Sequence, residues 1–249
     1  GRVERLAHAS SFYFDSQNNV KVLITGGDGA TATPTNLADI FGFSPSDIVQ
    51  AATSMNSTRS GHCAVWLANN KVLVVGGRGS APASAEIYDP VANTWTAVAS
   101  MPTPRADHTC CLLPDGTVLV AGGRDPASPS TPLVAVIYNP KTNAWSSTGV
   151  LIDRYQHTAT LLVSGVCYLI GGRQVSNNAI LNTAHAYRPF AQTLGSTTFP
   201  SGFSPNQDSL GTGRTLHAST RLGSGEVLVT GGFVVSGASD AATGATEVF

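Results

Sequence analysis

One pattern recurs five times along the chain and limits its fold more than any other feature. Each copy begins with Arg-x-x-His and continues as an apolar, strand-like run that ends in Gly-Gly. The copies follow one another at intervals of roughly 50 residues, a period typical of propellers and solenoids. The pairs are Arg5/His8, Arg59/His62, Arg105/His108, Arg154/His157 and Arg214/His217, and the doublets are Gly26-Gly27, Gly76-Gly77, Gly122-Gly123, Gly171-Gly172 and Gly231-Gly232.

Each copy predicts four short strands. The first follows Arg-x-x-His, and a turn such as Pro114-Asp115-Gly116 leads into the second. The second strand is almost wholly apolar, as expected of a strand that is covered on both faces. The third ends in an aromatic residue, and the fourth begins at Trp95 or Trp145 in copies two and three. The expected third strands are residues 38–41, 85–88, 135–138, 184–187 and 246–249.

The glycine doublets need an explanation in the backbone. Glycine at the end of a strand weakens it by roughly 0.5–1 kcal/mol relative to alanine, so its presence in all five copies indicates a specific requirement. Positive φ or a close approach of another backbone near a crowded axis meets that requirement.

The full pattern resembles the kelch repeat. Besides Arg-x-x-His and Gly-Gly, the second copy contains Ile87-Tyr88-Asp89-Pro90 and Asn93-Thr94-Trp95, which are typical of that repeat. The resemblance covers the whole chain and implies an all-β fold, a β-propeller of four-stranded antiparallel blades around a central channel. Five copies imply five blades in one domain, with the last blade lacking its outer strand. The expected blades are residues 1–54, 55–100, 101–149, 150–209 and 210–249.

Composition excludes several classes of partner. The formal charge is −1, charged residues make up 12% of the chain, and there is no run of Lys or Arg. Electrostatic capture of nucleic acid or of an anionic membrane is therefore not expected. No apolar stretch approaches the ~20 residues of a membrane span, so no membrane insertion is expected.

The polar residues of the repeat allow two interpretations. Because the first two strands of a blade are antiparallel, the Arg-x-x-His pairs are expected to share one rim with the residues after Gly-Gly. Eight arginines on one rim predict an anion site. A structural role is favoured for Arg-x-x-His itself, because every blade carries it. The arginines are expected to bond to carbonyls or acids of the neighbouring blade, and the candidate acids are Asp39, Glu86, Glu247, Asp107 and Asp153. The binding candidates on this rim are Asp28, Arg78, Arg124, Arg173 and Phe233.

Neither metal binding nor catalysis is expected from these motifs. Five histidines do not match the three- or four-ligand sites of zinc. Copper-radical oxidases of the galactose and glyoxal oxidase type are built on similar blades, and that resemblance implies an Arg-x-Tyr-His motif at the copper. Here the residue before each His is never Tyr, and Tyr155 lies one position early. Hydrolase elbows and phosphate loops are also missing from the sequence. We therefore expect no cofactor, no metal and no catalytic residue.

The cysteines and the single sequon bear on the compartment. Cys63, Cys110, Cys111 and Cys167 fall inside expected strands without metal-ligand spacing, and we interpret them as small core residues, with a disulfide as the alternative. Asn56 begins the sequence Asn-Ser-Thr, a candidate glycosylation site. It favours an extracellular or cell-surface location over others.

The leading functional hypothesis is a non-catalytic module that binds a protein or a glycan. The loops between the second and third strands differ in length and sequence, as expected where function is added to a repeating scaffold. One alternative is a structural subunit of a larger extracellular or surface assembly. A degenerate relative of the copper-radical oxidases is the other.

The last expected strand predicts an interaction of its own. It consists of Thr246, Glu247, Val248 and Phe249, and the fourth strand that should cover its edge is missing from the sequence. Gly1 lies only four residues before Arg5, so the N-terminal residues are not expected to supply it. Open strand edges are normally covered or blocked. We therefore expect a strand from another chain or from further sequence to pair here by β-augmentation.

Overall fold

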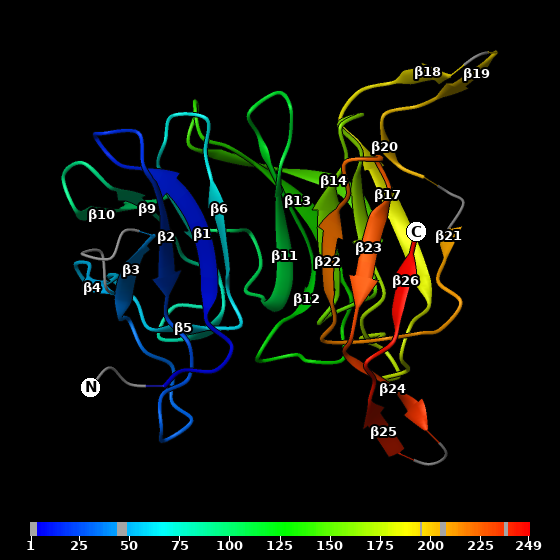
Figure 1. Cartoon of the computed structure of the whole chain (residues 1–249), viewed down its shortest axis with the longest axis horizontal. Coiled ribbons are helices and arrows are strands. Elements are labelled where there is room, and N and C mark those ends of the chain that lie inside the picture. Colours follow the sequence, from blue (N-terminus) through cyan, green and yellow to red (C-terminus); the bar gives the residue numbers. More distant parts are fainter. Residues whose placement is uncertain (1–3, 44–48, 195, 205–207, 237–238) are drawn as a thin grey trace.

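The computed structural model describes residues 4–43, 49–194, 196–204, 208–236 and 239–249 as an all-β chain. Its main sheets form a five-blade β-propeller arrangement, in which blades 1 and 5 lie toward opposite ends of the long axis (Figure 1). In every blade the second strand lies between the first and third, and all pairings are antiparallel. The expected fold class is confirmed. Among the described residues, no helix is long and apolar enough to cross a membrane.

The strands of the first three blades match the expected four-strand plan. Blade 1 consists of β1 (Ala9–Phe14), β2 (Val20–Thr25), β3 (Ala38–Gly42) and β4 (Gln50–Ala51). Blade 2 consists of β6 (Cys63–Trp66), β7 (Val72–Val75), β9 (Ala85–Asp89) and β10 (Thr94–Val98), with the short pair β5 (Arg59–Ser60) and β8 (Arg78–Gly79) beside them. Blade 3 consists of β11 (Ala106–Leu112), β12 (Val118–Arg124), β13 (Leu133–Asn139) and β14 (Ala144–Ile152).

Blades 4 and 5 depart from this plan at their outer strands. Blade 4 contains β15 (Thr158–Leu161), β16 (Cys167–Ile170) and β17 (Thr183–Arg188), and two short strands, β20 (Gly202–Phe203) and β21 (Asp208–Ser209), replace its fourth strand. Blade 5 contains β22 (Ala218–Arg221), β23 (Val227–Thr230) and β26 (Thr246–Val248). Two hairpins, β18 (Gln192–Leu194) with β19 (Thr197–Phe199) and β24 (Phe233–Ser236) with β25 (Ser239–Ala242), project from opposite ends of the blades (Figure 1).

The core lies between successive blades. The first strands of neighbouring blades lie side by side, from β1 through β6, β11 and β15 to β22. Each hydrophobic cluster joins two blades; Leu73 and Val75 of blade 2, for example, pack with Val118 and Val120 of blade 3. All four residues of β7 are buried, as expected for a strand covered on both faces. Blade-to-blade packing therefore supplies most of the buried apolar surface.

The glycine doublets fit the backbone of one blade to the next. The N–H of Gly77 donates to the carbonyl of Arg105 at 2.8 Å, and the N–H of Gly123 donates to the carbonyl of Arg154 at 2.8 Å. At Gly122 φ is +65°, and a Cβ would lie 2.5 Å from the carbonyl oxygen of Arg154. Only glycine permits both this φ and this approach, so the expected backbone reason is confirmed.

A second set of backbone contacts links all five blades near the axis. The residue before each repeat histidine has φ between 52° and 59°. In blades 2 to 5 its N–H donates to the carbonyl of the equivalent residue in the preceding blade, at 2.7 to 3.2 Å. We call this set the backbone belt: Ala7, Gly61, Asp107, Gln156 and Leu216.

Blades 5 and 1 do not make these contacts with each other among the described residues. The N–H of Gly232 donates to no carbonyl among the described residues, although its four counterparts all do. A Cβ on Gly231 would meet only the Thr243 carbonyl, at 3.6 Å. Most of the exposed large hydrophobic side chains also lie in these two blades: Leu6, Phe12, Val20, Leu37, Phe41 and Phe43 in blade 1, and Leu216, Phe233, Val235 and Val248 in blade 5.

The outer tryptophans join their blade to the previous one. Trp145 packs on Tyr138 with ring centroids 4.9 Å apart, and its Nε1 donates to the Ala99 carbonyl at 2.7 Å. Trp95 packs on Tyr88 in the same way, and its Nε1 donates to the Thr53 carbonyl.

We expect Trp145→Ala to lower the free energy of unfolding by about 3 kcal/mol, the lower end of the range for buried aromatics, because the indole is partly exposed. Denaturant titration would measure this value. Trp145→Phe keeps most of the ring contact and should cost less. A melting curve like that of the wild type for Trp145→Ala would contradict the role given to the fourth strand.

Candidate functional site

The five sequence-predicted binding residues occupy equivalent positions on one face. Each follows a Gly-Gly doublet and pairs through its backbone with a residue of the Arg-x-x-His motif in its own blade. The pairs are Leu6 with Asp28, Ser60 with Arg78, Ala106 with Arg124, Tyr155 with Arg173 and Thr215 with Phe233. We call Asp28, Arg78, Arg124, Arg173 and Phe233, together with Asp107, the rim.

A charged network connects the rim of blades 1 to 3, and the ring of Tyr155 extends it to blade 4. Arg78 Nη1 lies 3.0 Å from both carboxylate oxygens of Asp107, and its Nη2 lies 3.4 Å from Asp28. Arg124 Nη2 also reaches Asp107, at 3.4 Å, while its guanidinium lies 4.3 Å from the centre of the Tyr155 ring. Asp107 therefore bridges two arginines from neighbouring blades, beside a cavity of about 190 Å³.

Every rim arginine has a carboxylate partner. Arg173 pairs with Asp240 of hairpin β24–β25, in addition to the pairs of Arg78 and Arg124. Asp153 does not pair with an arginine of the repeat: it accepts hydrogen bonds from Gln174, Val175 and Ser176, which lower its pKa against the opposing effect of burial. Counted together with Asp240, the rim therefore carries three arginines and three aspartates, so its positive and negative charges balance.

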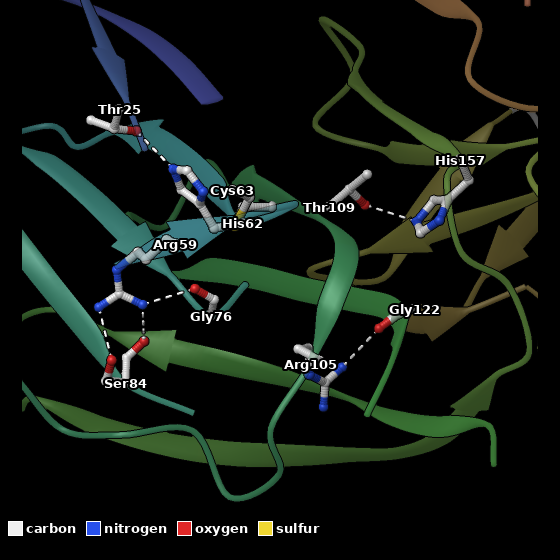
Figure 2. Close-up of a disulfide and its surroundings, with 11 residues drawn as sticks. Thr25, Arg59, His62, Cys63, Gly76, Ser84, Arg105, Thr109, Gly122 and His157 are labelled. Atoms are coloured by element: carbon white, nitrogen blue, oxygen red, sulfur yellow. Dashed lines mark hydrogen bonds between the residues drawn. A yellow bond between two sulfur atoms is a disulfide. The ribbon is translucent and has the colours of Figure 1, made fainter. Parts of the chain in front are cut away.

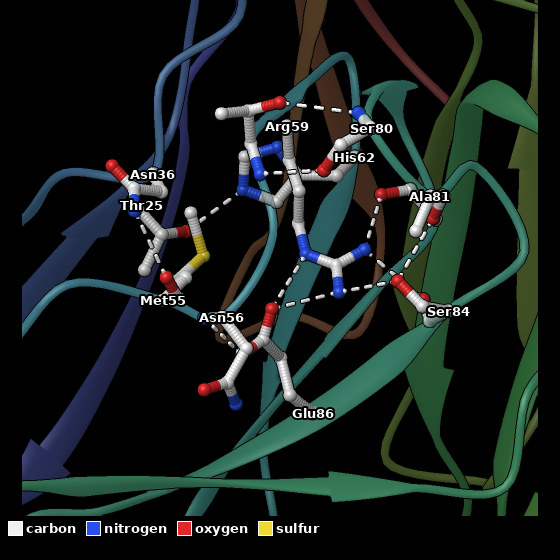
Figure 3. A network of polar contacts seen from close by, with 12 residues as sticks. Thr25, Asn36, Met55, Asn56, Arg59, His62, Ser80, Ala81, Ser84 and Glu86 are labelled. Carbon is white, nitrogen blue, oxygen red and sulfur yellow. Dashed lines mark hydrogen bonds and ion pairs between the residues drawn. The ribbon is translucent and has the colours of Figure 1, made fainter.

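The repeat arginines do not reach the rim, which favours the structural interpretation over an anion site of eight arginines around one opening. Arg59 is 1% exposed, and its guanidinium donates to the carbonyls of Gly76 and Ser84 and to the carboxylate of Glu86 (Figure 3). Asp39 and Glu247 are the corresponding partners of Arg5 and Arg214, as expected. These acids belong to the arginine's own blade, whereas we expected partners in the neighbouring one.

Arg105 and Arg154 lack a carboxylate, because valine and histidine occupy the place of Glu86 on their third strands. Arg105 donates to the carbonyls of Gly122 and Val134 (Figure 2). Burial lowers the pKa of both arginines to about 10. Carbonyls alone therefore accept from Arg105, whereas Arg154 donates to the Thr183 hydroxyl in addition to carbonyls.

Three of the repeat histidines make hydrogen bonds between blades. His62 Nε2 bonds to Thr25 at 2.8 Å and His157 Nε2 to Thr109 at 2.9 Å, while His217 bonds to Thr158 (Figure 2). Burial lowers the pKa of His62 to about 3 and that of His217 to about 4, with nearby arginines acting in the same direction. These neutral imidazoles link neighbouring blades through hydrogen bonds. They do not form a ring of metal ligands among the described residues.

His8 departs from the other repeat histidines in its surroundings. Its side chain is exposed, whereas its four counterparts are buried. Its Nδ1 lies 3.2 Å from the carbonyl oxygen of Arg5, a residue of its own blade. The physical reason is the junction itself: blade 5 makes none of the Gly-Gly contacts with blade 1 that enclose a histidine elsewhere.

The structure also shows the surroundings of two further residues singled out in the sequence, Tyr155 and Asn56. Tyr155, the tyrosine nearest to an oxidase-like motif, donates to Asn178 and lies beneath Arg124. Asn56 is exposed, and its backbone N–H donates to Glu86. Sequence reasoning missed Asp240 and hairpin β24–β25; the β-branched residues Val234 and Val235 were a signal for that hairpin.

We expect the triple change of Arg78, Arg124 and Arg173 to serine to cost less than about 2 kcal/mol, because partly exposed ion pairs contribute little. Arg105→Ser alone should cost about 3 kcal/mol, because it leaves two buried carbonyls without donors. Thermal melts of the two variants would compare them. The opposite ranking would reverse the division into structural and binding arginines.

A comparison with models of protein families identifies the repeat. A family model described as the KLHDC2/KLHL20/DRC7 Kelch-repeats domain matches residues 8–232. No curated protein matched the chain. The matched segment spans all five Gly-Gly doublets and extends into every blade.

Proposed function

The chain belongs to the family of kelch-repeat propeller domains, and on this premise we propose that it is a non-catalytic module that binds a partner protein through its rim. Domains of this family are commonly protein-interaction modules.

The Arg78–Asp107–Arg124 network is the observation that carries this proposal. Its side chains come from neighbouring blades, and Arg78 and Arg124 remain 39% and 34% exposed. Tyr155 supports the guanidinium of Arg124 from below. Fixed, solvent-facing donors next to a carboxylate suit the mixed polar surface of a protein.

A glycan is the less favoured ligand. Sugar rings pack well on exposed aromatic side chains, and Phe233 is the one exposed aromatic residue on the rim as described. Oxidase chemistry of the copper-radical type has no support from the placement of Tyr155.

The experiment compares two matched triple variants. The first changes the rim arginines Arg78, Arg124 and Arg173 to serine. The second changes Lys71, Lys141 and Arg221 to serine; these cations lie near turns at the opposite end of the blades. Proteins from the source organism that bind the wild type would be quantified by mass spectrometry, with a glycan array run in parallel. We expect the first variant alone to lose its partner. Equal retention by both variants, or binding only on the glycan array, would overturn the proposal.

As a second candidate, we propose that the outer edge of blade 5 pairs with a further strand, supplied by another chain or by additional sequence. Strand β26 pairs with β23 and with no other described strand, and Val248 is 56% exposed. In blades 2 and 3 a fourth strand covers the equivalent edge, with Trp95 opposite Tyr88 and Trp145 opposite Tyr138. Phe249 follows β26 in the place of those tyrosines.

A cavity lies where the missing tryptophan would pack. It has a volume of about 350 Å³ and is lined by Phe249, Tyr168 and Asp208, among others. Trp95 and Trp145 fill the equivalent place in blades 2 and 3, where they pack on Tyr88 and Tyr138. We assign the edge to an extended strand that carries a tryptophan.

The chain supplies its own probe for this edge. A synthetic peptide of residues 91–99, which contains β10, should bind the protein and shift the emission of its Trp95 to shorter wavelength. The same peptide with Trp95→Ala should bind at least tenfold more weakly, measured by calorimetry. Equal affinity of the two peptides, or an unchanged affinity for Phe249→Ala protein, would remove the assignment.

A further inference from the structure

Two cysteines and one histidine meet between blades 2 and 3. Cys63 on β6 and Cys110 on β11 are joined as a disulfide, with 6.0 Å between their Cα atoms (Figure 2). One ring nitrogen of His108 lies close to both sulfur atoms, and the three atoms all fall within 4.8 Å of one another. His108 precedes Cys110 by two residues on β11, so both side chains project from the same face of the strand.

His108 differs from the other buried repeat histidines. The Nε2 atoms of His62, His157 and His217 each bond to a threonine hydroxyl. Both ring nitrogens of His108 lack a hydrogen-bond partner, although the residue is only 6% exposed. A buried polar group without a hydrogen-bond partner is costly in free energy, so a group of this kind calls for a further partner such as an ion.

The sequence explains why the imidazole of His108 faces sulfur. His157 and His217 bond to Thr109 and Thr158, and each threonine directly follows the histidine of the preceding blade. At the junction between blades 2 and 3 the equivalent residue is Cys63. A thiol therefore stands where two other junctions place a hydroxyl, and Cys110 adds a second sulfur atom.

This donor set matches the preferences of soft cations. Two thiolates and a neutral imidazole are typical ligands of Zn²⁺ and Cu⁺. Metal–sulfur bonds of about 2.3 Å and metal–nitrogen bonds of about 2.0 Å would fit three donors this close together.

We propose that the reduced protein binds one soft cation of the Zn²⁺ or Cu⁺ class through Cys63, Cys110 and His108. Reduction adds two electrons and two protons to the disulfide, supplied by a thiol or phosphine reductant, and gives two thiols. The cation then displaces the two thiol protons. Cys110 also lines the concave surface formed by the first strands, beside a cavity of about 500 Å³ through which an ion reaches the site.

The chain contains a matched pair of cysteines without an imidazole. Cys111 and Cys167 are buried together between blades 3 and 4. Burial and the neighbouring Cys111 raise the pKa of the Cys167 thiol well above its usual value, which disfavours the thiolate that a metal needs. This pair provides the control for any effect of free thiols alone.

The experiment titrates the full chain with Zn²⁺ and, separately, with Cu⁺ under anaerobic conditions after phosphine reduction. We expect one equivalent of at least one of these ions to bind, and Co²⁺ to give the thiolate charge-transfer absorption. Cys63→Thr should abolish this binding and still fold, because it restores the residue type of Thr109 and Thr158 and gives His108 a partner. Cys167→Ser should bind like the wild type.

Three results would overturn the proposal. The first is reduced wild-type protein that binds neither ion stoichiometrically. The second is binding that survives in Cys63→Thr, and the third is binding that disappears in Cys167→Ser. His108→Ala separates the imidazole from the thiols: it should weaken Zn²⁺ binding while both thiols remain titratable, and unchanged affinity would remove His108 from the site.

Discussion

Gly122→Ala should destabilise the protein by at least about 4 kcal/mol, whereas Gly231→Ala should cost only about 1–2 kcal/mol. The two glycines have the same φ of +65° and the same place in the repeat. A Cβ at position 122 would lie 2.5 Å from the Arg154 carbonyl oxygen, a backbone atom that cannot rotate away. A Cβ at position 231 meets nothing closer than 3.6 Å, so only the cost of the left-handed backbone remains.

Denaturant titration of both variants under the same conditions measures the difference. Each glycine controls for the other, because the intrinsic cost of alanine at this φ is common to both. Similar costs at the two positions would mean that the contact between blades does not explain the doublets. Gly231→Ala has a further use, because it should become harmful once another blade-like element packs on the face of blade 5.

Glu86→Ala should lower the free energy of unfolding by about 3–5 kcal/mol, the cost of removing one partner from a buried ion pair. Glu86 accepts hydrogen bonds from Arg59 Nε and Nη2 and from the Asn56 backbone N–H. Both side chains of the pair are 1% exposed, so solvent cannot replace the carboxylate. The variant would leave a buried guanidinium with part of its hydrogen bonds unmade.

Glu86→Gln is the control. It keeps an acceptor oxygen near Arg59 while removing the charge, so we expect about 1–3 kcal/mol, the range for hydrogen bonds to charged groups. Chemical denaturation at neutral pH would give both values. A loss below about 1 kcal/mol for Glu86→Ala would show that the carbonyls of Gly76 and Ser84 alone hold Arg59, as carbonyls hold Arg105.

The repeat made the blades predictable, because its apolar runs and turns are local signals that also determine how a blade packs. The buried second strands and the need for glycine at positions such as 122 follow from such signals. The direction in which the Arg59 side chain points does not follow from local signals. A guanidinium on a short first strand can turn toward the opening or into the blade. The carbonyls of Gly76 and Ser84 decide this, and they lie 17 and 25 residues away in the sequence, outside the strands of the blade.

The candidate site was predictable only in part for a related reason. Positions after Gly-Gly predicted which residues share the rim, since antiparallel strands bring their ends together. The pairing of Arg173 with Asp240 depends on hairpin β24–β25, whose loop has no counterpart in the other blades. The exposure of His8 and the proximity of Cys63 and Cys110 depend on how two blades pack, which no motif within a single repeat records.

The backbone belt separates the chemistry of the axial opening from the stability of the scaffold. Its hydrogen bonds use only N–H and C=O groups, so they do not depend on which side chain each member carries. The five members of the belt are an alanine, a glycine, an aspartate, a glutamine and a leucine. Substitutions at these positions can therefore change the side chains around the opening one at a time, while the blades keep their relative orientation.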